Sequence, residues 1–340
     1  MEHRSAGRDR EERGPRAGDR ALRAKPAVLR AVLALGVLAA ALGCGSKSIR
    51  ATIPGSPTPD QMAEFWVEPT DLASRDLFWG PGGKEKAPDP GWIWTLVSRD
   101  NTGFSPSFHL HDPREMEWSA KLGREAQSEV VASRLMWALG FHQPPTYYVK
   151  GWSITGPRWS GPQDPARFRP DLPGMKKVGE WDWHQNPFVG TPAWRGALVM
   201  MPLLGNSDLK PSQNALYDLD APREGARRWY VMRDLGQAFG ETGMIWPKRN
   251  DVETWEKEKF IEGLREDGTV RFNYSGLWKG LFRNLRPEDV RWTSERLARI
   301  SDRQLEDAFR AAEYPPEVAA RFIRVLKQKI AEGLALKPAP

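Results

Sequence analysis

The sequence predicts an α+β fold of two lobes, a small β-rich lobe followed by a larger and mainly helical one. Most of the short β-prone runs lie before residue 152, whereas most of the helical periodicity and capping signals lie after residue 193. All sixteen tryptophans lie between Trp66 and Trp292, which favours a single folded unit. We therefore expect an N-lobe over 61–152, a connector over 153–192 and a helical C-lobe over 193–336.

The expected N-lobe consists of strands and one helix. Three β-prone runs that turn signals separate predict strands over 91–99, 104–111 and 117–122. Residues 124–139 have helical periodicity, and the helix is expected to end at Gly140, because glycine is common just after helix C-termini. A further strand is expected over 145–152.

The rest of the chain reads as a connector and then mainly as helices. Residues 153–192 contain many Gly, Pro and Trp residues and are expected to be loop-like. The apolar run 193–204 predicts a helix that ends at Gly205. Short strands are expected near 215–219 and 228–232. Helices are expected over 253–265, 293–300, 301–312 and 316–332.

The N-terminal segment has the features of a targeting signal. An uncharged run over 31–43 follows basic residues, and its thirteen residues are fewer than the roughly 20 that span a bilayer as a helix. The lone cysteine, Cys44, follows this run, and residues 41–44 (Ala-Leu-Gly-Cys) resemble a bacterial lipoprotein lipobox. A short anchor helix or an ordinary signal peptide is the alternative interpretation.

The lipobox resemblance implies a mature protein that begins at Cys44. Residues 1–43 would then be a removed signal peptide, and a lipid on Cys44 would anchor the protein to a membrane. The expected location is the bacterial cell envelope, on the periplasmic or outer surface. Residues 44–60 are rich in Gly, Ser, Pro and Thr, which predicts a flexible tether.

Composition excludes several classes of protein. A mean hydropathy of −0.59 excludes a multi-pass membrane protein, and a single cysteine excludes a disulfide framework. Of the net charge of +6, residues 1–43 carry +4, so the remainder is nearly neutral. Arg321, Arg324 and Lys327 form a basic face on the last helix that is expected to be solvated. We expect no nucleic-acid partner.

Three short stretches carry the candidate chemistry. Lys121 lies on an expected strand, and Glu129 lies on the helix that follows. A polar loop over 206–214 follows the apolar helix, and Arg-Asp-Leu-Gly over 233–236 follows an expected strand. Phosphoryl transfer needs a cation held by a carboxylate, a carboxylate near the acceptor hydroxyl, and oxygen ligands for Mg²⁺. The chain supplies these groups in that order.

This set resembles the protein-kinase-like superfamily. Residues 208–214 read D-L-K-P-x-x-N, which is close to the kinase catalytic-loop motif. The finer resemblance is to atypical members, the HipA-type bacterial kinases and phosphatidylinositol-kinase-like folds. In these, a helix with E-x-x-x-x-x-L-x-x-x-x-G follows the strand lysine, a spacing met here by Glu129, Leu135 and Gly140. The resemblance covers roughly residues 91–240.

The resemblance implies a two-lobed kinase-like fold that binds ATP and Mg²⁺ in the cleft between the lobes. By this resemblance, Lys121 would contact the ATP phosphates and Glu129 would orient it. Asp208 would be the catalytic base, and Lys210 would steady the transferring phosphoryl group. The acceptor is a hydroxyl compound that the sequence does not identify.

The resemblance also implies a set of metal ligands. Asp234 would hold Mg²⁺ together with Asn214 or Gln213. Kinases place the loop asparagine five residues after the catalytic aspartate, whereas here Gln213 is at five and Asn214 at six. Both residues therefore remain candidates at this stage.

Two alternatives to an active kinase stay open. A catalytically inactive pseudokinase would bind nucleotide without transfer. A non-catalytic envelope lipoprotein would use a Trp-rich surface to bind a glycan or a protein. ATP is scarce outside the cytoplasm, so another phosphoryl donor is a further possibility. Convergence of Lys121, Glu129, Asp208 and Asp234 on one cleft would favour the kinase-like interpretation.

Overall fold

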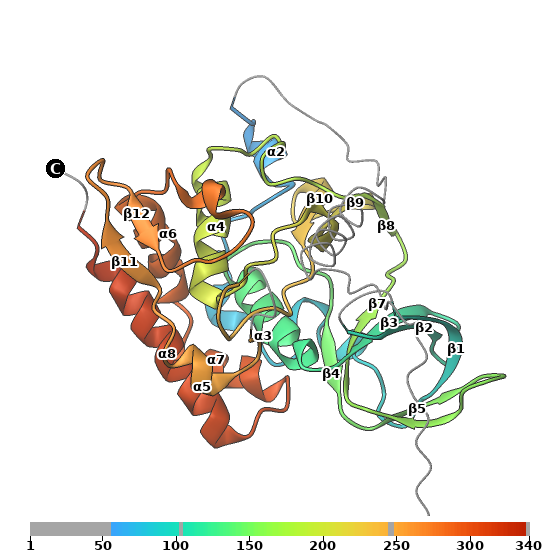
Figure 1. Cartoon of the computed structure of the whole chain (residues 1–340). Coiled ribbons are helices and arrows are strands. Elements are labelled where there is room, and N and C mark those ends of the chain that lie inside the picture. Colours follow the sequence, from blue (N-terminus) through green and yellow to red (C-terminus); the bar gives the residue numbers. More distant parts are fainter. Residues whose placement is uncertain (1–55, 102–104, 244–247, 338–340) are drawn as a thin grey trace, which may run out of the picture. The chain divides into compact units, whose positions relative to one another are not determined.

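The computed structural model describes residues 56–101, 105–243 and 248–337, and over these ranges it confirms the α+β class. Figure 1 shows a curled seven-stranded sheet together with several helices and two smaller sheets. The described residues belong to one compact unit. The expected signal peptide, Cys44 and most of the expected tether lie outside the described residues.

Groups of strands are separated by single helices along the chain, and three consecutive helices follow the last strand. The α-helices of the described ranges are α2 (Pro59–Met62), α3 (Glu125–Ala138), α4 (Pro192–Leu204), α5 (Val252–Trp255), α6 (Pro287–Leu297), α7 (Asp302–Arg310) and α8 (Pro316–Ala335). The strands are β1 (Ile93–Asp100), β2 (Ser107–His111), β3 (Glu117–Leu122), β4 (Tyr147–Val149), β5 (Trp152–Thr155), β6 (Gly161–Gln163), β7 (Ala166–Pro170), β8 (Met175–Gly179), β9 (Asn214–Arg223), β10 (Ala226–Met232), β11 (Ile261–Leu264) and β12 (Val270–Phe272). None of these helices combines the length and apolar character needed to cross a bilayer.

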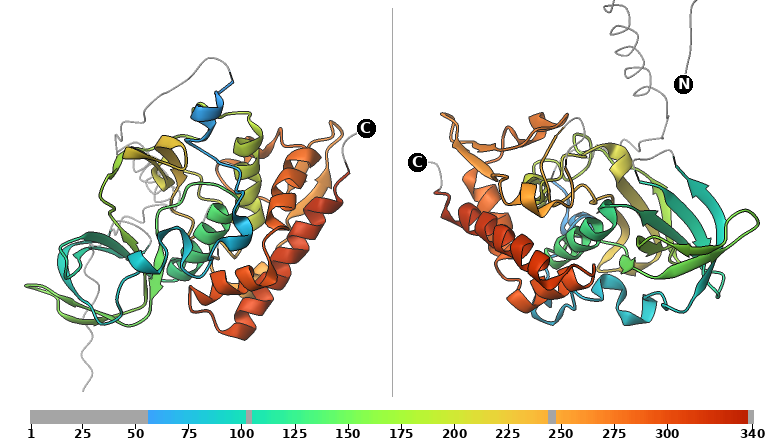
Figure 2. Two further views of the ribbon diagram at one scale, coloured as in Figure 1. Left: turned by 180° about the vertical axis from the view of Figure 1, so that it is seen from behind. Right: turned by 60° about the horizontal axis from the view of Figure 1, so that its bottom comes forward.

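The large sheet has the strand order β4-β7-β3-β2-β1-β5-β6. Its neighbouring strands run antiparallel except for β1 and β5, which are parallel. One face is apolar because alternate residues of a strand point to the same side. Trp94, Phe108, Trp118 and Phe168 are buried on it and form a cluster of edge-on and tilted rings. Figure 2 shows how strongly this sheet curls.

The expectation of a loop over 153–192 is wrong. This stretch contains most of β5 and the whole of β6, β7 and β8. Strand β7 lies inside the large sheet between β4 and β3. The Gly and Pro residues of this stretch mark the turns between short strands, which single-sequence reading does not separate from a continuous loop.

Helix α3 matches the expected helix over 124–139, but it is buried nearly all round. Twelve of its fourteen residues are buried, and these include polar and charged residues as well as apolar ones. It packs against β3, β4 and β7 on one side and against α7 on another. The acidic residues of its first two turns, Glu125 and Glu129, are therefore held in the interior.

The remaining elements complete the main core. Strands β8, β9 and β10 form a three-stranded sheet, and α4 packs against α6 and α8. The helix expected over 301–312 is present as α7, which begins with a capping box of Ser301 and Gln304. The helix expected over 253–265 is wrong beyond α5, because β11 and β12 form a hairpin there. Its Asp267-Gly268 turn is a sequence signal typical of hairpins.

Candidate functional site

A cavity of about 520 Å³ lies where β1, β2, β3 and β7 meet α3, the loop after α4 and the segment after β10. Every described side chain that lines it is polar or charged, with six cationic and four acidic groups. Five predicted site residues line it: Lys121, Asp208, Lys210, Gln213 and Asp234. Residues far apart in the sequence thus meet at one concave surface, which is where ligands usually bind.

Lys121 is held by three carboxylates. Its Nζ atom lies 2.7 Å from an Asp234 carboxylate oxygen and 2.8 Å from Glu125, but 3.9 Å from Glu129. The Lys121 side chain is only 12% exposed. Burial alone would lower the pKa of Lys121, but the negative charges of Glu129, Asp234 and Glu125 raise it above its usual value. Lys121 is therefore a permanent cation at the cavity wall.

Asp234 reaches Lys121 because the chain after β10 passes close to the start of α3. An added Cβ atom at Gly236 would lie 2.6 Å from the Glu125 Cβ, so this approach requires glycine. The Ser128 hydroxyl donates to the Gly236 carbonyl at 2.6 Å and fixes the turn. Burial alone would raise the pKa of Asp234, but Lys121 lowers it overall, so the carboxylate is ionised.

The loop that carries Asp208 leaves α4 through a left-handed glycine. Gly205 has φ 71° and caps the helix, and the side chain of Leu209 is buried and anchors the loop. Asp208 accepts a hydrogen bond from the Gln213 side-chain amide at 2.9 Å and lies 3.2 Å from Lys210 Nζ. The Asp208 side chain is 22% exposed and lines the cavity. Beside it lies the ammonium group of Lys210, which is carried by a long, flexible side chain.

Backbone hydrogen bonds join this loop to the segment after β10. The carbonyl oxygen of Gln213 accepts from the amides of Arg233 and Asp234 at 3.0 and 3.1 Å. The two acidic residues Asp208 and Asp234 are consequently fixed relative to each other by backbone rather than by long side chains.

The two candidate amide residues have different surroundings. The Asn214 side chain is buried and donates to the Trp181 carbonyl at 3.0 Å, and Asn214 does not line the cavity. Gln213 lines the cavity and uses its amide nitrogen to contact Asp208. Its amide oxygen remains as an oxygen donor of the kind that Mg²⁺ prefers.

Glu129 lies beneath the cavity and not in its lining. Its side chain is 1% exposed, and its main partners are Arg169 at 2.5 Å and Arg167 at 3.1 Å. Arg169 also donates to the Arg233 carbonyl at 3.1 Å. Glu129 therefore contributes to Lys121 mainly through charge, and it positions two arginines at the cavity wall.

The residues that hold Lys121 most closely were not all predicted. Glu125 is four residues after Lys121 and also pairs with Arg249. Its place on the same helical face as Glu129 is a local signal that points to it. Arg167 and Arg169 alternate on β7, and only the recognition of a strand there would have placed both on one face.

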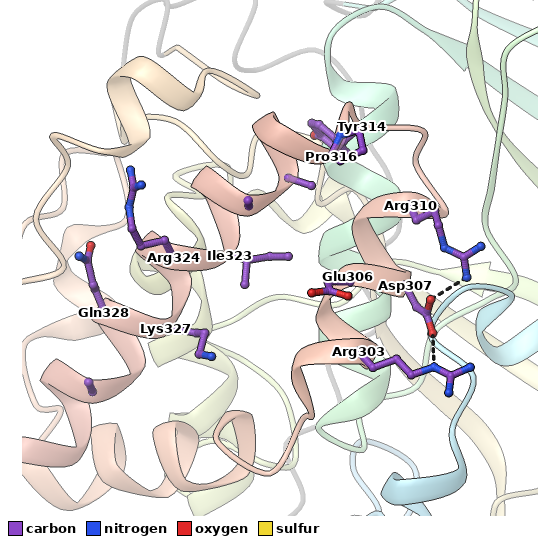
Figure 3. Close-up of a pocket in the computed structure, with 13 residues that line it drawn as sticks. Arg303, Glu306, Asp307, Arg310, Tyr314, Pro316, Ile323, Arg324, Lys327 and Gln328 are labelled. Carbon is purple, nitrogen blue, oxygen red and sulfur yellow. Dashed lines mark hydrogen bonds and ion pairs between the residues drawn. The ribbon is translucent and has the colours of Figure 1, made fainter.

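A second, larger groove lies between α7 and α8, with a volume of about 1030 Å³ (Figure 3). Ile323 lies in the middle of it, and charged side chains surround it. Asp307 at its edge pairs with Arg310 at 2.7 Å and with Arg303 at 4.0 Å. None of the residues predicted to carry chemistry lines this groove in the described part of the chain.

Comparison of the chain with protein-family models, with curated proteins and with solved structures finds no significant match.

Proposed function

We propose that this protein is a kinase-like phosphotransferase that binds ATP and Mg²⁺ in the cavity beside Lys121 and transfers the terminal phosphoryl group to a hydroxyl acceptor. The proposal includes a two-lobed kinase-like arrangement, with the curled sheet and α3 as the small lobe. It rests on the residues of the cavity and on the sequence resemblance.

The convergence of Lys121, Asp208 and Asp234 is the observation that carries the proposal. They come from β3, from the loop after α4 and from the segment after β10, and all three line one cavity. A lysine between carboxylates, a partly exposed aspartate and a second aspartate are the groups that phosphoryl transfer requires. If these three residues only formed separate salt bridges at the surface, they would not be expected to line the same cavity.

The residues define a sequence of events for the transfer. Lys121 and Lys210 would bind phosphate oxygens, and the pair of charges would offset the negative charge of the donor. Asp208 would accept the proton of the acceptor hydroxyl as its oxygen bonds to the terminal phosphorus. The bond from that phosphorus to the bridging oxygen would break, and the shortened donor would keep the bridging oxygen.

The cavity fits a magnesium ion through its oxygen donors. Asp234 uses one carboxylate oxygen for Lys121 and retains the other, and Gln213 offers an amide oxygen. Mg²⁺ is usually held by one or two protein oxygens together with phosphate oxygens and water. When bound, the ion would neutralise charge on the donor phosphates. Because the Asn214 side chain is directed to Trp181, the proposal uses Gln213.

The alternatives receive less support from the described residues. Trp159 is the one described tryptophan that is largely exposed, and most of the others are in or against the core. Few described tryptophan side chains are therefore exposed to form a Trp-rich binding surface. A pseudokinase has the same cavity and differs only in lacking transfer, so it is an outcome of the test.

The experiment measures binding and turnover separately on the full-length chain. Thermal shift with Mg²⁺ and ATP should stabilise the wild type, and Asp234→Asn should abolish the shift. ATP hydrolysis, in which water takes the place of the hydroxyl acceptor, measures turnover. Its rate should fall by about 100-fold or more in Asp208→Asn, while ATP binding is retained. Asp218→Asn is the control, because Asp218 pairs with Arg228 at 2.7 Å outside the cavity. Absence of any ATP shift in the wild type would refute the proposal, and binding without turnover would identify a pseudokinase.

We further propose that the chain is a lipoprotein of the bacterial cell envelope, anchored through Cys44. This rests on the lipobox resemblance alone, since Cys44 lies outside the described residues. Cys44→Ala should move the protein from the membrane fraction to the soluble fraction of cells that express it. Equal membrane association of variant and wild type would refute the anchor.

A further inference from the structure

The large sheet provides one wall of the cavity, and the side chains on this wall are polar or charged. Pairing of strands aligns Ser107 with Lys121 and Lys121 with Arg167. Two residues away along each strand, Ser119 of β3 is aligned with Arg169 of β7. All five residues line the cavity, so they share one face of the sheet.

The opposite face of the same strands holds the apolar residues. Phe108 pairs with Ala120, and Ala120 pairs with Phe168, and all three are fully buried. Because side chains alternate along a strand, this register places every apolar residue of these rows away from the cavity. The polar wall is therefore a consequence of the register that the aromatic core fixes.

This wall carries donors suited to phosphate oxygens. Arg167 and Arg169 are both buried, and the Nε atom of Arg169 has no hydrogen-bond partner within the described ranges. Arg233 adds a third guanidinium, and its Nε atom is likewise without a partner there. Guanidinium groups bind phosphates through several N–H donors at once, which makes them specific for that group.

The same wall offers little to a nucleobase. Bases are usually bound by aliphatic side chains or by stacking on aromatic rings. No described residue that lines the cavity is aliphatic, and His109 is its only described ring. The lining therefore offers many polar contacts to phosphates and few apolar contacts to a base.

We infer that the site selects its donor by the phosphoanhydride chain and not by the base. Inorganic tripolyphosphate and nucleoside triphosphates with any base would then serve alike. The inference rests on the proposed function. In the step, the acceptor oxygen bonds to the terminal phosphorus and loses its proton to Asp208. The bridging oxygen leaves with the rest of the donor, as pyrophosphate when tripolyphosphate is used.

Calorimetric titration of the full-length chain with Mg²⁺ present tests the inference. ATP, GTP and tripolyphosphate should bind with dissociation constants within about threefold of one another, and adenosine should not bind. ATP binding at least about tenfold tighter than both GTP and tripolyphosphate would overturn the inference and leave the proposed function standing. Absence of binding by all three would refute the proposed function itself.

A variant tests whether the contacts are made to phosphates. Arg233→Gln should weaken ATP and tripolyphosphate by the same factor, about 3- to 10-fold, because the lost contact is common to both. Arg228→Gln is the matched control on β10, where Arg228 pairs with Asp218 outside the cavity, and it should change neither affinity. Weakening of ATP alone would show a contact to the nucleoside and would overturn the inference. Thermal midpoints without ligand establish that each variant folds, and Lys210→Gln repeats the comparison at an exposed position.

Discussion

The side chains of Lys121 and Lys329 both have little exposed surface, but their surroundings give them opposite properties. Lys121 has two carboxylate oxygens within 2.8 Å and lines a cavity. Lys329 is 3% exposed, and its Nζ atom lies 3.4 Å from the centre of the Trp255 ring without a hydrogen-bond partner in the described chain. Burial lowers the pKa of Lys329 to about 7, although Glu258 and Glu332 oppose this.

The difference teaches what makes a buried charge a candidate site. A buried cation without a close partner loses its proton more easily and contributes to packing as a long apolar chain. A buried cation that several carboxylates hold keeps its charge and its position. Lys121 therefore has a fixed charge that a ligand can use, whereas Lys329 has neither a cavity nor a constant charge.

The largest expected effect comes from Lys121→Met. This change leaves the nearly buried Glu125 carboxylate and the partly exposed Asp234 carboxylate without Lys121, and removing one partner of a largely buried ion pair costs about 4 kcal/mol of unfolding free energy. The variant should also lose binding of Mg²⁺ with ATP. Urea unfolding followed by circular dichroism measures the first effect, and titration calorimetry measures the second.

Lys329→Met should change stability in the opposite direction. The substitution removes a buried ammonium group and keeps the volume of the side chain, so we expect a gain of about 3 kcal/mol at pH 7. Binding of ATP should be unchanged. The same urea unfolding experiment measures it, and a loss of stability in both variants would break the comparison of the two lysines.

Gly236→Ala should disturb the site through packing alone. The added methyl group meets the Glu125 Cβ at 2.6 Å, and a crowded contact of this kind costs about 2 kcal/mol. Thermal unfolding measures it. Gly280→Ala is the control, because an added Cβ there meets nothing within 4 Å. Equal effects in the two variants would show that the close approach of Gly236 to α3 is not tight.

The smallest expected effect is a dependence of stability on pH. The pKa of Lys329 is lowered to about 7 in the folded chain, so between that value and its ordinary value of 10.5 the unfolded chain binds more protons. The unfolding free energy should therefore rise with pH, by about 1 kcal/mol between pH 7 and 8. Urea unfolding at both pH values measures it, and the rise should be absent in Lys329→Met.

The predictable parts of the fold are those that depend on local sequence. Strand β3 and helices α3, α4 and α8 were predicted to within a few residues, since each has a clear period or a capping residue. Strand β7 was missed, because its assignment depends on pairing with β3 and β4. The β11–β12 hairpin was missed because a helix was expected over 253–265, a range that includes β11.

The residues of the candidate site show the same contrast between local sequence signals and long-range strand pairing. Lys121, Asp208 and Asp234 were found because each lies in a recognisable local motif. Arg167 and Arg169 were missed because their position at the cavity depends on the pairing of β7 with β3, which one sequence does not reveal. The choice between Gln213 and Asn214 depends on the short 3₁₀ turn over Pro211–Gln213, which sets the direction of each side chain.

Lys329 shows that some of this information is present in the pattern. It lies two residues after Lys327, so at about 100° per residue it points away from the basic face of the last helix. The structure bears this out, since Lys327 pairs with Asp302 at the surface, while Lys329 is buried. Periodicity thus separates a solvated lysine from a buried one, but it does not tell whether carboxylates surround it.

The central claim is that the cavity beside Lys121 binds the phosphates of a donor. The most direct measurement is a crystal structure of the chain with Mg²⁺ and a non-hydrolysable triphosphate. The account predicts phosphates in contact with Lys121, Lys210 and Arg233, and the metal ion on Asp234 and Gln213. A triphosphate bound elsewhere, such as in the α7–α8 groove, with the Lys121 cluster unchanged, would contradict it.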